Sequence, residues 1–242
     1  AIALPCPHKE DVYYIFCTQY DNLFLNKVSV NGSEGSVLQQ NVPQFDFLCT
    51  RGGRITATRH SNGSDWWLVN VLCSTPSGQP YSQFWPSDVA AVSLVDSTGI
   101  AFTNYFSLDN VSEGQAGEIS FSKDGSRLLV LTGYSMGIYS FNRCDGSIDK
   151  INALNNDMSH IIEYISGEWS VTGEYVYVSG YANRFYINQY KIDDNIKINN
   201  ITEIDEKKIF LHMQMSPNNI IYMAYDSINA VFDTLFQRYH YF

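Results

Sequence analysis

Short apolar runs alternate with turn sequences along the whole chain. Residues 12–16, 66–71 and 128–131 are three such runs, and Asn62-Gly63 is one of the turns. Apolar runs of about four to eight residues, rich in β-branched and aromatic side chains and bounded by Gly, Asn or Asp, predict β-strands. Apolar positions nowhere keep a helical spacing over about 11 residues. The pattern therefore predicts an all-β chain.

One strand–turn–strand unit occurs three times. Its copies begin at Phe121, Trp169 and Met215, which lie 48 and 46 positions apart, and they read FSKDG, WSVTG and MSPNN. A period of this length, with three or four strands in each unit, is typical of β-propeller blades. The repeat therefore predicts a β-propeller within the all-β class.

Five residues of these hairpins are interpreted as structural. Asp favours turns because its side chain bonds its own backbone, and Gly accepts a positive φ. Large aromatic side chains in such repeats are mostly core residues. The predicted structural residues are Gly63, Asp124, Gly125, Trp169 and Gly173.

Both faces of several predicted strands are apolar, as residues 128–131, 175–178 and 66–69 illustrate. A sheet with one wet face would alternate apolar and polar residues, whereas stacked blades bury both faces. We expect a single propeller domain over residues 1–242, incomplete at both ends and part of a propeller of about six to seven blades. The predicted blades cover about residues 10–50, 52–97, 114–152, 160–204 and, partially, 210–242.

Composition and charge exclude some classes of function. The net charge is −10 with a pI of about 4.8, and an acidic surface repels phosphate backbones, so nucleic acid is not an expected partner. The apolar runs are far shorter than the roughly 20 residues that span a bilayer, so no membrane insertion is expected.

Cysteine spacing and metal motifs predict no cofactor. The chain has five cysteines and no C-x-x-C pair, which indicates buried free thiols, with one disulfide left open. No H-E-x-x-H sequence, EF-hand loop or Cys/His cluster is present, so no metal is expected. The cysteines are Cys6, Cys17, Cys49, Cys73 and Cys144.

A series of motifs carries a family resemblance. It comprises YYIF at residues 13–16, HSNGSDWWLV at 60–69, ISFSKDG at 119–125 and GEYVYVS at 173–179. The series resembles secreted Bacteroidetes propeller-like proteins, which often end in a gliding-motility-associated or type IX secretion sorting domain. The resemblance covers about residues 3–225. It implies a secreted or cell-surface location in bacteria, a recognition role and no shared enzymatic activity.

The chain departs from this family at both ends. Family members usually carry a blade before the point where this chain begins, and residues 227–242 match nothing in the pattern. The resemblance therefore implies a middle portion of the propeller or a diverged short form. Another chain that completes the propeller is a possible partner.

Three residues of one hairpin are candidates for ligand binding. His60, Asp65 and Trp66 would present a polar and aromatic surface to a glycan or peptide. The competing interpretation is that His60 and Asp65 pair across the turn while the tryptophans pack between blades. The sequence leaves both interpretations open.

Residues 133–137 match the G-x-S-x-G pattern of hydrolases. That motif requires a strand before the serine and a helix after it. Here the following residues, 138–141, read as another strand. We therefore interpret the segment as a hairpin loop and expect no catalytic residue in it.

The favoured function is a non-enzymatic, secreted or cell-surface module that binds a protein or a glycan. The alternative is a propeller enzyme, a hydrolase or lyase acting on glycans, for which Glu118 and Glu168 are candidate carboxylates. Because these two glutamates stand near equivalent places in two repeats, a structural role is favoured for them. A second alternative is a structural subunit of a surface assembly.

Overall fold

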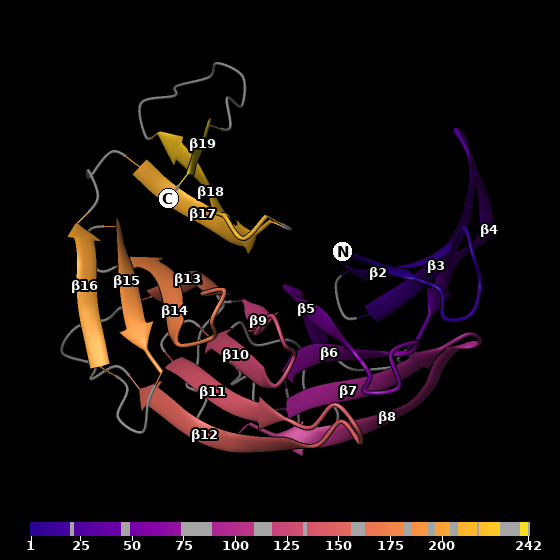
Figure 1. Cartoon of the computed structure of the whole chain (residues 1–242), viewed down its shortest axis with the longest axis horizontal. Coiled ribbons are helices and arrows are strands. Elements are labelled where there is room, and N and C mark those ends of the chain that lie inside the picture. The colour runs from indigo at the N-terminus through magenta and orange to yellow at the C-terminus, as the bar shows by residue number, and fades with distance from the viewer. Residues whose placement is uncertain are drawn as a thin grey trace. The chain divides into compact units, whose positions relative to one another are not determined.

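The computed structural model shows a chain built of β-strands (Figure 1). It describes residues 1–19, 22–44, 49–73, 89–108, 118–132, 135–155, 163–181, 185–192, 197–203, 208–216, 218–227 and 238–241. In these residues there is no helix, as the apolar spacing predicts. Accordingly, no helix of this part of the chain is long and apolar enough to cross a bilayer.

The strands form five sheets, and strands that are consecutive in the chain lie side by side in each sheet. Sheet 1 contains β1 (Ile2–Pro5), β2 (Val12–Gln19), β3 (Asn22–Asn31) and β4 (Glu34–Pro43). Sheet 2 contains β5 (Cys49–Arg59), β6 (Trp66–Cys73), β7 (Val89–Asp96) and β8 (Gly99–Ser107). Sheet 3 contains β9 (Ile119–Phe121), β10 (Arg127–Thr132), β11 (Ser135–Phe141) and β12 (Ile148–Asn155).

The last two sheets follow the same order. Sheet 4 contains β13 (Glu163–Trp169), β14 (Tyr175–Tyr181), β15 (Phe185–Lys191) and β16 (Lys197–Glu203). Sheet 5 has three described strands, β17 (Lys208–Met215), β18 (Ile221–Ser227) and β19 (Arg238–Tyr241). Every pairing whose register is described is antiparallel. Antiparallel neighbours need only short turns, and the turn sequences supply them.

Two strands lie outside the ranges that the sequence pattern gave for the blades. β1 pairs with β2, so sheet 1 begins at Ile2 rather than near residue 10. β8 pairs with β7, so sheet 2 extends to Ser107 rather than to residue 97. β8 is an edge strand with exposed Phe102 and Tyr105, and a strand with a wet face gives a weaker apolar signal.

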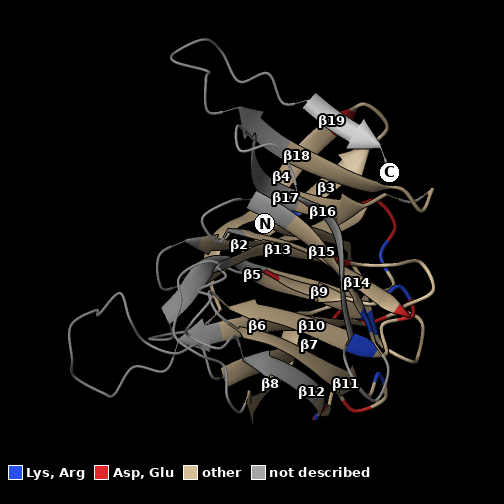
Figure 2. Ribbon diagram, turned by 90° about the vertical axis from the view of Figure 1, so that its left-hand side faces the viewer, with Lys and Arg blue, Asp and Glu red and all other residues tan. Residues whose placement is uncertain are grey.

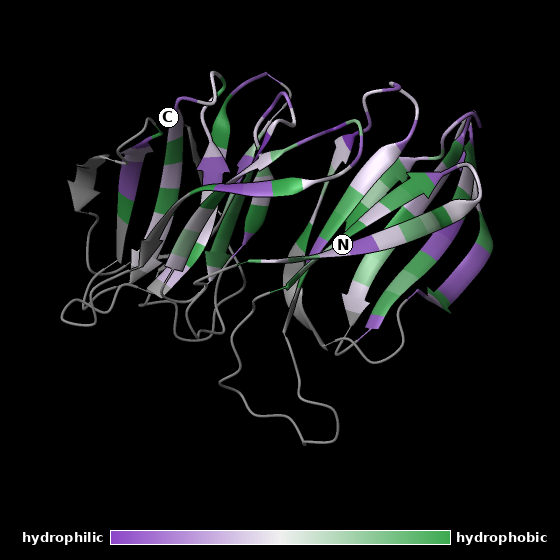
Figure 3. Ribbon diagram, turned by 90° about the horizontal axis from the view of Figure 1, so that it is seen from below, coloured by the Kyte–Doolittle hydropathy of each residue, from purple (hydrophilic) through white to green (hydrophobic). Residues whose placement is uncertain are grey.

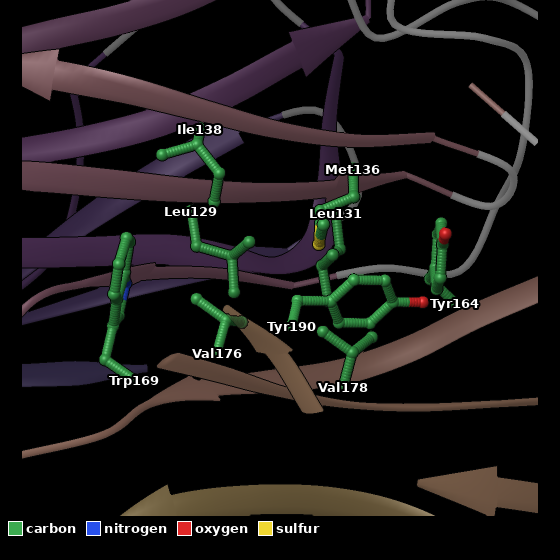
Figure 4. Close-up of a cluster of buried hydrophobic side chains, with 9 residues drawn as sticks. All are labelled: Leu129, Leu131, Met136, Ile138, Tyr164, Trp169, Val176, Val178 and Tyr190. Atoms are coloured by element: carbon green, nitrogen blue, oxygen red, sulfur yellow. The ribbon is translucent and has the colours of Figure 1, made fainter. Parts of the chain in front are cut away.

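The chain divides into two compact units, each with its own core. Unit 1 comprises residues 1–109 and 140–149, and unit 2 comprises residues 110–139 and 150–242. The core of unit 1 contains Leu4, Cys6, Tyr14, Phe16, Leu23, Leu25, Leu68 and Val95. The larger core of unit 2 contains Leu129, Leu131, Met136, Ile138, Tyr164, Trp169, Val176, Val178 and Tyr190 (Figure 4).

Burial on both faces of a strand is clearest in β10. Its residues 128–131 are all fully buried, as their unbroken apolar sequence predicts. Among residues 175–178 of β14, Val176 and Val178 are buried, while Tyr175 and Tyr177 are half-buried. Figure 3 shows the corresponding hydrophobic bands along the strands. The central strands therefore pack against neighbours on both sides, which is the arrangement that stacked blades require.

Three of the five cysteines are free thiols. Cys6 is buried, Cys17 is half-buried and Cys144 is exposed. The prediction of a buried free thiol is confirmed for Cys6, whereas Cys17 and Cys144 are free but not buried.

Candidate functional site

The three repeated turns share one hydrogen-bond pattern. In each copy the backbone N–H of the fifth residue donates to the carbonyl of the serine at the second position. The serine hydroxyl also accepts a backbone N–H from the start of the next strand. The backbone distances are 2.8 Å for Gly125 to Ser122, 3.0 Å for Gly173 to Ser170 and 3.0 Å for Asn219 to Ser216. The repeat in the sequence is therefore a repeat of turn geometry.

The fifth position of each turn adopts a left-handed backbone. The φ values are +71° at Gly125, +71° at Gly173 and +67° at Asn219. Gly adopts this region without a steric penalty, and Asn tolerates it better than other residues. This explains why the third copy keeps the turn without a glycine. The predicted turn role of Gly125 and Gly173 agrees with this geometry.

A pocket of about 380 Å³ lies over the first two of these turns, in unit 2. We call it the charged pocket, because Lys123, Asp124 and Arg127 line it together with hydroxyl residues. Figure 2 shows charged residues mainly at strand ends and in turns. The charged pocket is lined by Ser122, Lys123, Asp124, Ser126, Arg127, Val171, Thr172 and Gly173.

Both cations of the charged pocket are held by defined bonds. The ammonium group of Lys123 donates to Oδ1 of Asn219 at 2.7 Å. The guanidinium group of Arg127 donates to the carbonyl of Gly173 at 3.0 Å. An ammonium has three donors and a guanidinium has five, and these bonds use one donor of each. The bonds therefore fix the positions of the two positive charges at the pocket.

Asp124 is the carboxylate of this pocket. The hydroxyls of Ser122 and Ser126 each donate to it at 2.7 Å, and the backbone N–H of Ser126 donates at 3.1 Å. Burial acts to raise the pKa of Asp124, but these bonds and the charge of Arg127 outweigh it, so the pKa lies below the usual value. Asp124 therefore stays ionised at neutral pH, and its bonds hold the turn in place.

Replacing Asp124 by Asn is expected to make the stability of the protein less sensitive to acid. A carboxylate with a lowered folded-state pKa stabilises the fold above its unfolded pKa of about 3.9. That contribution disappears as the pH falls through the folded-state pKa. Asp124→Asn should therefore lower the free energy of unfolding by up to about 1 kcal/mol at neutral pH, because exposed charges are screened. Urea unfolding at neutral pH and at about pH 3 measures this.

Ser126→Ala is the matched control for this experiment. It removes one hydroxyl bond to Asp124 while leaving the charge in place. An NMR titration should then show the pKa of Asp124 moving back toward its usual value. A loss of stability in Asp124→Asn that is equal at the two pH values would contradict the assignment.

His60, Asp65 and Trp66 lie in and next to the β5–β6 hairpin of unit 1, where the sequence placed them. The His60 Nδ1 accepts the N–H of Asn62 at 3.0 Å, which leaves Nε2 to donate to the carbonyl of Cys144 at 3.1 Å. The Asp65 carboxylate accepts the amide of Asn62 at 2.7 Å. The two side chains thus bond to Asn62 rather than to each other, and only their backbones pair.

The two tryptophans of this hairpin face opposite sides of sheet 2. The Trp66 indole donates to the carbonyl of Pro5 at 2.9 Å, and the guanidinium of Arg59 lies 3.7 Å from its ring centre. Trp67 is fully buried and donates to the carbonyl of Arg143 at 2.9 Å. These contacts agree with the competing interpretation, in which the two tryptophans pack between blades. Ligand binding at His60, Asp65 and Trp66 stays a prediction.

Glu118 and Glu168 connect the first strands of neighbouring sheets in unit 2. The hydroxyl of Ser166 donates to the Glu118 carboxylate and accepts the N–H of Met213 at 2.8 Å. The Glu168 carboxylate accepts the N–H of Met215 at 3.1 Å. Both carboxylates therefore bond to the strand of the next sheet, which is a structural link.

The described part of the G-x-S-x-G segment, residues 135–137, belongs to the strand β11. Gly133 and Tyr134 lie outside the described residues, while Ser135 is buried at the first position of β11. A strand in place of the required helix excludes the nucleophile elbow here. Within the described residues, no group of three or more His, Cys, Asp or Glu side chains is placed to hold a metal ion.

Sequence reasoning missed Lys123 and Arg127 as site residues. Both lie in or beside a turn that the repeat identifies, and single cations in a turn are usually solvated. The available signal was the alignment of the three copies of the repeat. In the fold, two of the aligned turns lie side by side, and this brings Lys123 and Arg127 next to Thr172. Only a tertiary contact between the turns creates the pocket.

Comparison with known proteins gives matches among solved structures alone. No family model and no curated protein matches the chain. The periplasmic gluconolactonase PpgL of Pseudomonas aeruginosa matches with a TM-score of 0.58 and 12% identity, over 96% of this chain and 67% of that one. The β-propeller domain of Cps50 (Swd1) from Myceliophteria thermophila has a TM-score of 0.56 and 12% identity, over 94% and 67%. A glucose dehydrogenase has a TM-score of 0.50 and 9% identity, over 93% and 77%.

These matches confirm the predicted fold class, an all-β propeller. At such identities the likeness concerns the fold. This chain spans about two thirds of the length of the first two structures. The resemblance to secreted Bacteroidetes propellers, the secreted or cell-surface location and a completing partner chain stay predictions.

The comparisons contradict the prediction of a non-enzymatic binding module, and with it the prediction that the chain is not an enzyme. Solved propellers of matching fold include a gluconolactonase and a glucose dehydrogenase. The prediction rested on the repeat, the acidic surface, the many aromatic residues and the absence of a catalytic constellation in the sequence. The last argument fails for a propeller, because a site assembled from the loops of several sheets leaves no short motif in the sequence.

Proposed function

We propose that this chain is a propeller hydrolase whose substrate is a sugar-derived lactone bound in the charged pocket. The observation that carries the proposal is the pairing of two fixed cations with hydroxyl side chains in one pocket of about 380 Å³. Lys123 and Arg127 supply the positive charge, and Ser122, Ser126 and Thr172 supply the hydroxyls. A polyhydroxylated ring with one polar carbonyl group matches this combination.

Hydrolysis of a lactone needs stabilisation of negative charge at one place. Water adds to the ring carbonyl carbon, the carbonyl oxygen becomes an oxyanion, and the ring C–O bond then breaks to leave a hydroxy acid. Fixed positive groups that face the developing oxyanion lower the barrier to this step. Lys123 and Arg127 are the groups of the charged pocket that can do so. The same charges attract the carboxylate of the product.

The hydroxyl residues of the pocket suit the rest of a sugar ring. A hydroxyl donates one hydrogen bond and accepts two, so a hydroxyl engaged in a turn keeps further bonding capacity. Thr172 is exposed at the rim, and Val171 beside it gives a small apolar edge. The pocket can therefore contact both the hydroxyls and the carbon skeleton of the ring.

Two solved structures of similar fold support the substrate class. One is a gluconolactonase and the other is a glucose dehydrogenase, so both names refer to a sugar or a sugar acid. The lactone is favoured over an intact glycan because the pocket is small and its cations suit a reaction that builds negative charge. This proposal keeps the hydrolase of the earlier alternative but replaces the glycan by a sugar-derived lactone as the substrate.

Lys123→Met is expected to lower kcat/KM for a lactone about 10- to 100-fold, the effect of one charge-assisted hydrogen bond in the transition state. The substrates are aldonolactones of five- and six-membered rings, and proton release reports their hydrolysis. The matched control is Lys9→Met. Lys9 is also an exposed lysine bonded to a carbonyl, that of Ser97 at 3.2 Å, but it belongs to unit 1 and is not among the residues that line the pocket.

Two results would overturn the proposal. One is a wild-type rate no higher than spontaneous hydrolysis for every lactone in the panel. The other is an equal loss of activity in Lys123→Met and Lys9→Met, because a loss that follows net charge alone does not depend on the pocket.

A further inference from the structure

A second cavity in unit 2, of about 350 Å³, lies between sheets 4 and 5. We call it the methionine cavity, because three of the five methionines of the chain line it. Its walls are otherwise mainly aliphatic and aromatic. The residues that form them include Met213, Met215, Met223, Tyr177, Ile187 and Ile221.

The repeat explains why a cavity is present at this place. Trp169 opens the second copy of the repeat, is 1% exposed and packs in the core between sheets 3 and 4. Figure 4 shows its ring beside Leu129 and Val176. Met215 stands at the same position in the third copy and lines the cavity. Where the chain supplies an indole between one pair of sheets, it leaves space between the next pair.

The composition of the walls favours an aromatic occupant. Thioether sulfurs make favourable contacts with aromatic rings, and flexible methionines adapt to the shape of a ligand. Apolar cavities of about 150 Å³ stay dry and accept a ring the size of benzene. A space of about 350 Å³ therefore holds a ring at least as large as an indole. Trp169 shows that the fold accommodates an indole ring at the equivalent position between sheets 3 and 4.

The methionine cavity and the charged pocket are adjacent. Val171 and Thr172 line both of them. The bond from Lys123 to Asn219 also joins a residue of the charged pocket to a residue of the methionine cavity. A single small molecule can thus contact both.

We infer that the methionine cavity binds the aromatic ring of an aryl-substituted substrate whose polar ring lies in the charged pocket. The inference rests on the proposed lactone hydrolysis for the identity of the polar part. Binding of the aromatic part follows from the cavity alone. This makes an aryl-substituted sugar lactone the substrate class of the enzyme.

Methyl-labelled methionine and indole as a probe test the aromatic site directly. In the full chain with [13C-methyl]methionine, indole should shift the resonances of Met213, Met215 and Met223 through its ring current. Met136, buried in the core between sheets 3 and 4, is the internal reference and should not shift. Equal shifts at Met136, or no shifts at millimolar indole, would overturn the inference.

Met215→Trp fills the cavity with the residue of the preceding copy. It should raise the dissociation constant of indole about 10- to 100-fold, the effect of losing one buried aromatic group. Met215→Leu, of similar volume, should keep binding and serves if the tryptophan variant does not fold. Unchanged indole binding in folded Met215→Trp would overturn the inference. Methionine shifts that follow protein concentration in the absence of indole would also overturn it, because they would indicate that a second copy of the chain occupies the cavity.

A kinetic comparison separates this inference from the proposed function. In wild type, an aryl-substituted lactone should have a KM about 10-fold or more below that of its unsubstituted parent. Met215→Trp should reduce this ratio. If indole shifts the methionine resonances but no lactone is hydrolysed, the proposed function is overturned and aromatic binding in the methionine cavity is supported. If a lactone is hydrolysed but indole causes no shifts, the proposed function is supported and aromatic binding is overturned.

Discussion

Replacing Trp169 by Ala is expected to lower the free energy of unfolding by about 3–5 kcal/mol, the range for removing a large buried aromatic side chain. Trp169 is 1% exposed and packs with Leu129 and Val176 in the core of unit 2 (Figure 4). Its indole N–H donates to the carbonyl of Ser120 at 3.1 Å, and the alanine variant would lose this part-buried hydrogen bond. The variant loses both the packing and the bond between β9 and β13.

Chemical denaturation followed by circular dichroism measures this loss. Trp169→Phe should lose less than the alanine variant, because it keeps most of the ring volume but not the N–H. Val171→Ala is the control, since Val171 lies two residues away and is 39% exposed, and its effect should stay within about 0.5 kcal/mol. A loss below about 1 kcal/mol in Trp169→Ala would show that the core does not depend on this residue.

Gly146→Ala is expected to destabilise the protein by about 2–4 kcal/mol, the sum of a backbone term and an overpacking term. Gly146 has a φ of +75°, which disfavours any side chain. A Cβ at this position would also lie 2.7 Å from the ring of Trp67. That ring cannot easily move, because it is 1% exposed and contacts the rings of His60, Phe102 and Phe141.

Gly63→Ala is the matched control for Gly146→Ala. Gly63 has a φ of +79° in the turn before Trp66, but a Cβ there would meet nothing within 4 Å. It should therefore cost only the backbone term, about 1–2 kcal/mol. The difference between the two variants, measured by thermal and urea unfolding, isolates the contact with Trp67. Equal losses in the two variants would contradict that contact.

Local chemistry made the turns predictable. Asp124 bonds its neighbouring residues, and Gly125 and Gly173 take the left-handed backbone, as their residue types indicate. Trp169 is buried because its size and hydrophobicity drive it from water. The turn properties depend on a few neighbouring residues, so the local sequence contains the necessary information.

The hairpin from His60 to Trp66 shows the limit of that reasoning. The sequence brings His60 and Asp65 close together but does not specify which partner each side chain takes. Asn62 lies between them and bonds to both, while the carbonyl of Cys144 binds the far side of the imidazole. That carbonyl is 84 residues away in the chain, and only folding brings it near.

The charged pocket could not be predicted from the sequence for a related reason. Lys123, Arg127 and Thr172 carry no motif, and they form one pocket because two copies of the turn stack against each other. The methionine cavity likewise requires sheets 4 and 5 to lie together, although the replacement of Trp169 by Met215 in the repeat was visible in the sequence. Sites built from several sheets are properties of packing rather than of any segment.

The sequence by itself determined the strands, the turns and the repeat, because apolar periodicity and turn chemistry act over a few residues. From these the propeller class follows. The tertiary structure alone decided which residues share a pocket, which bonds hold Glu118 and Glu168, and where the core leaves a cavity. These features depend on contacts between residues roughly one repeat apart, some 46 to 48 positions along the chain, and no local pattern encodes such contacts.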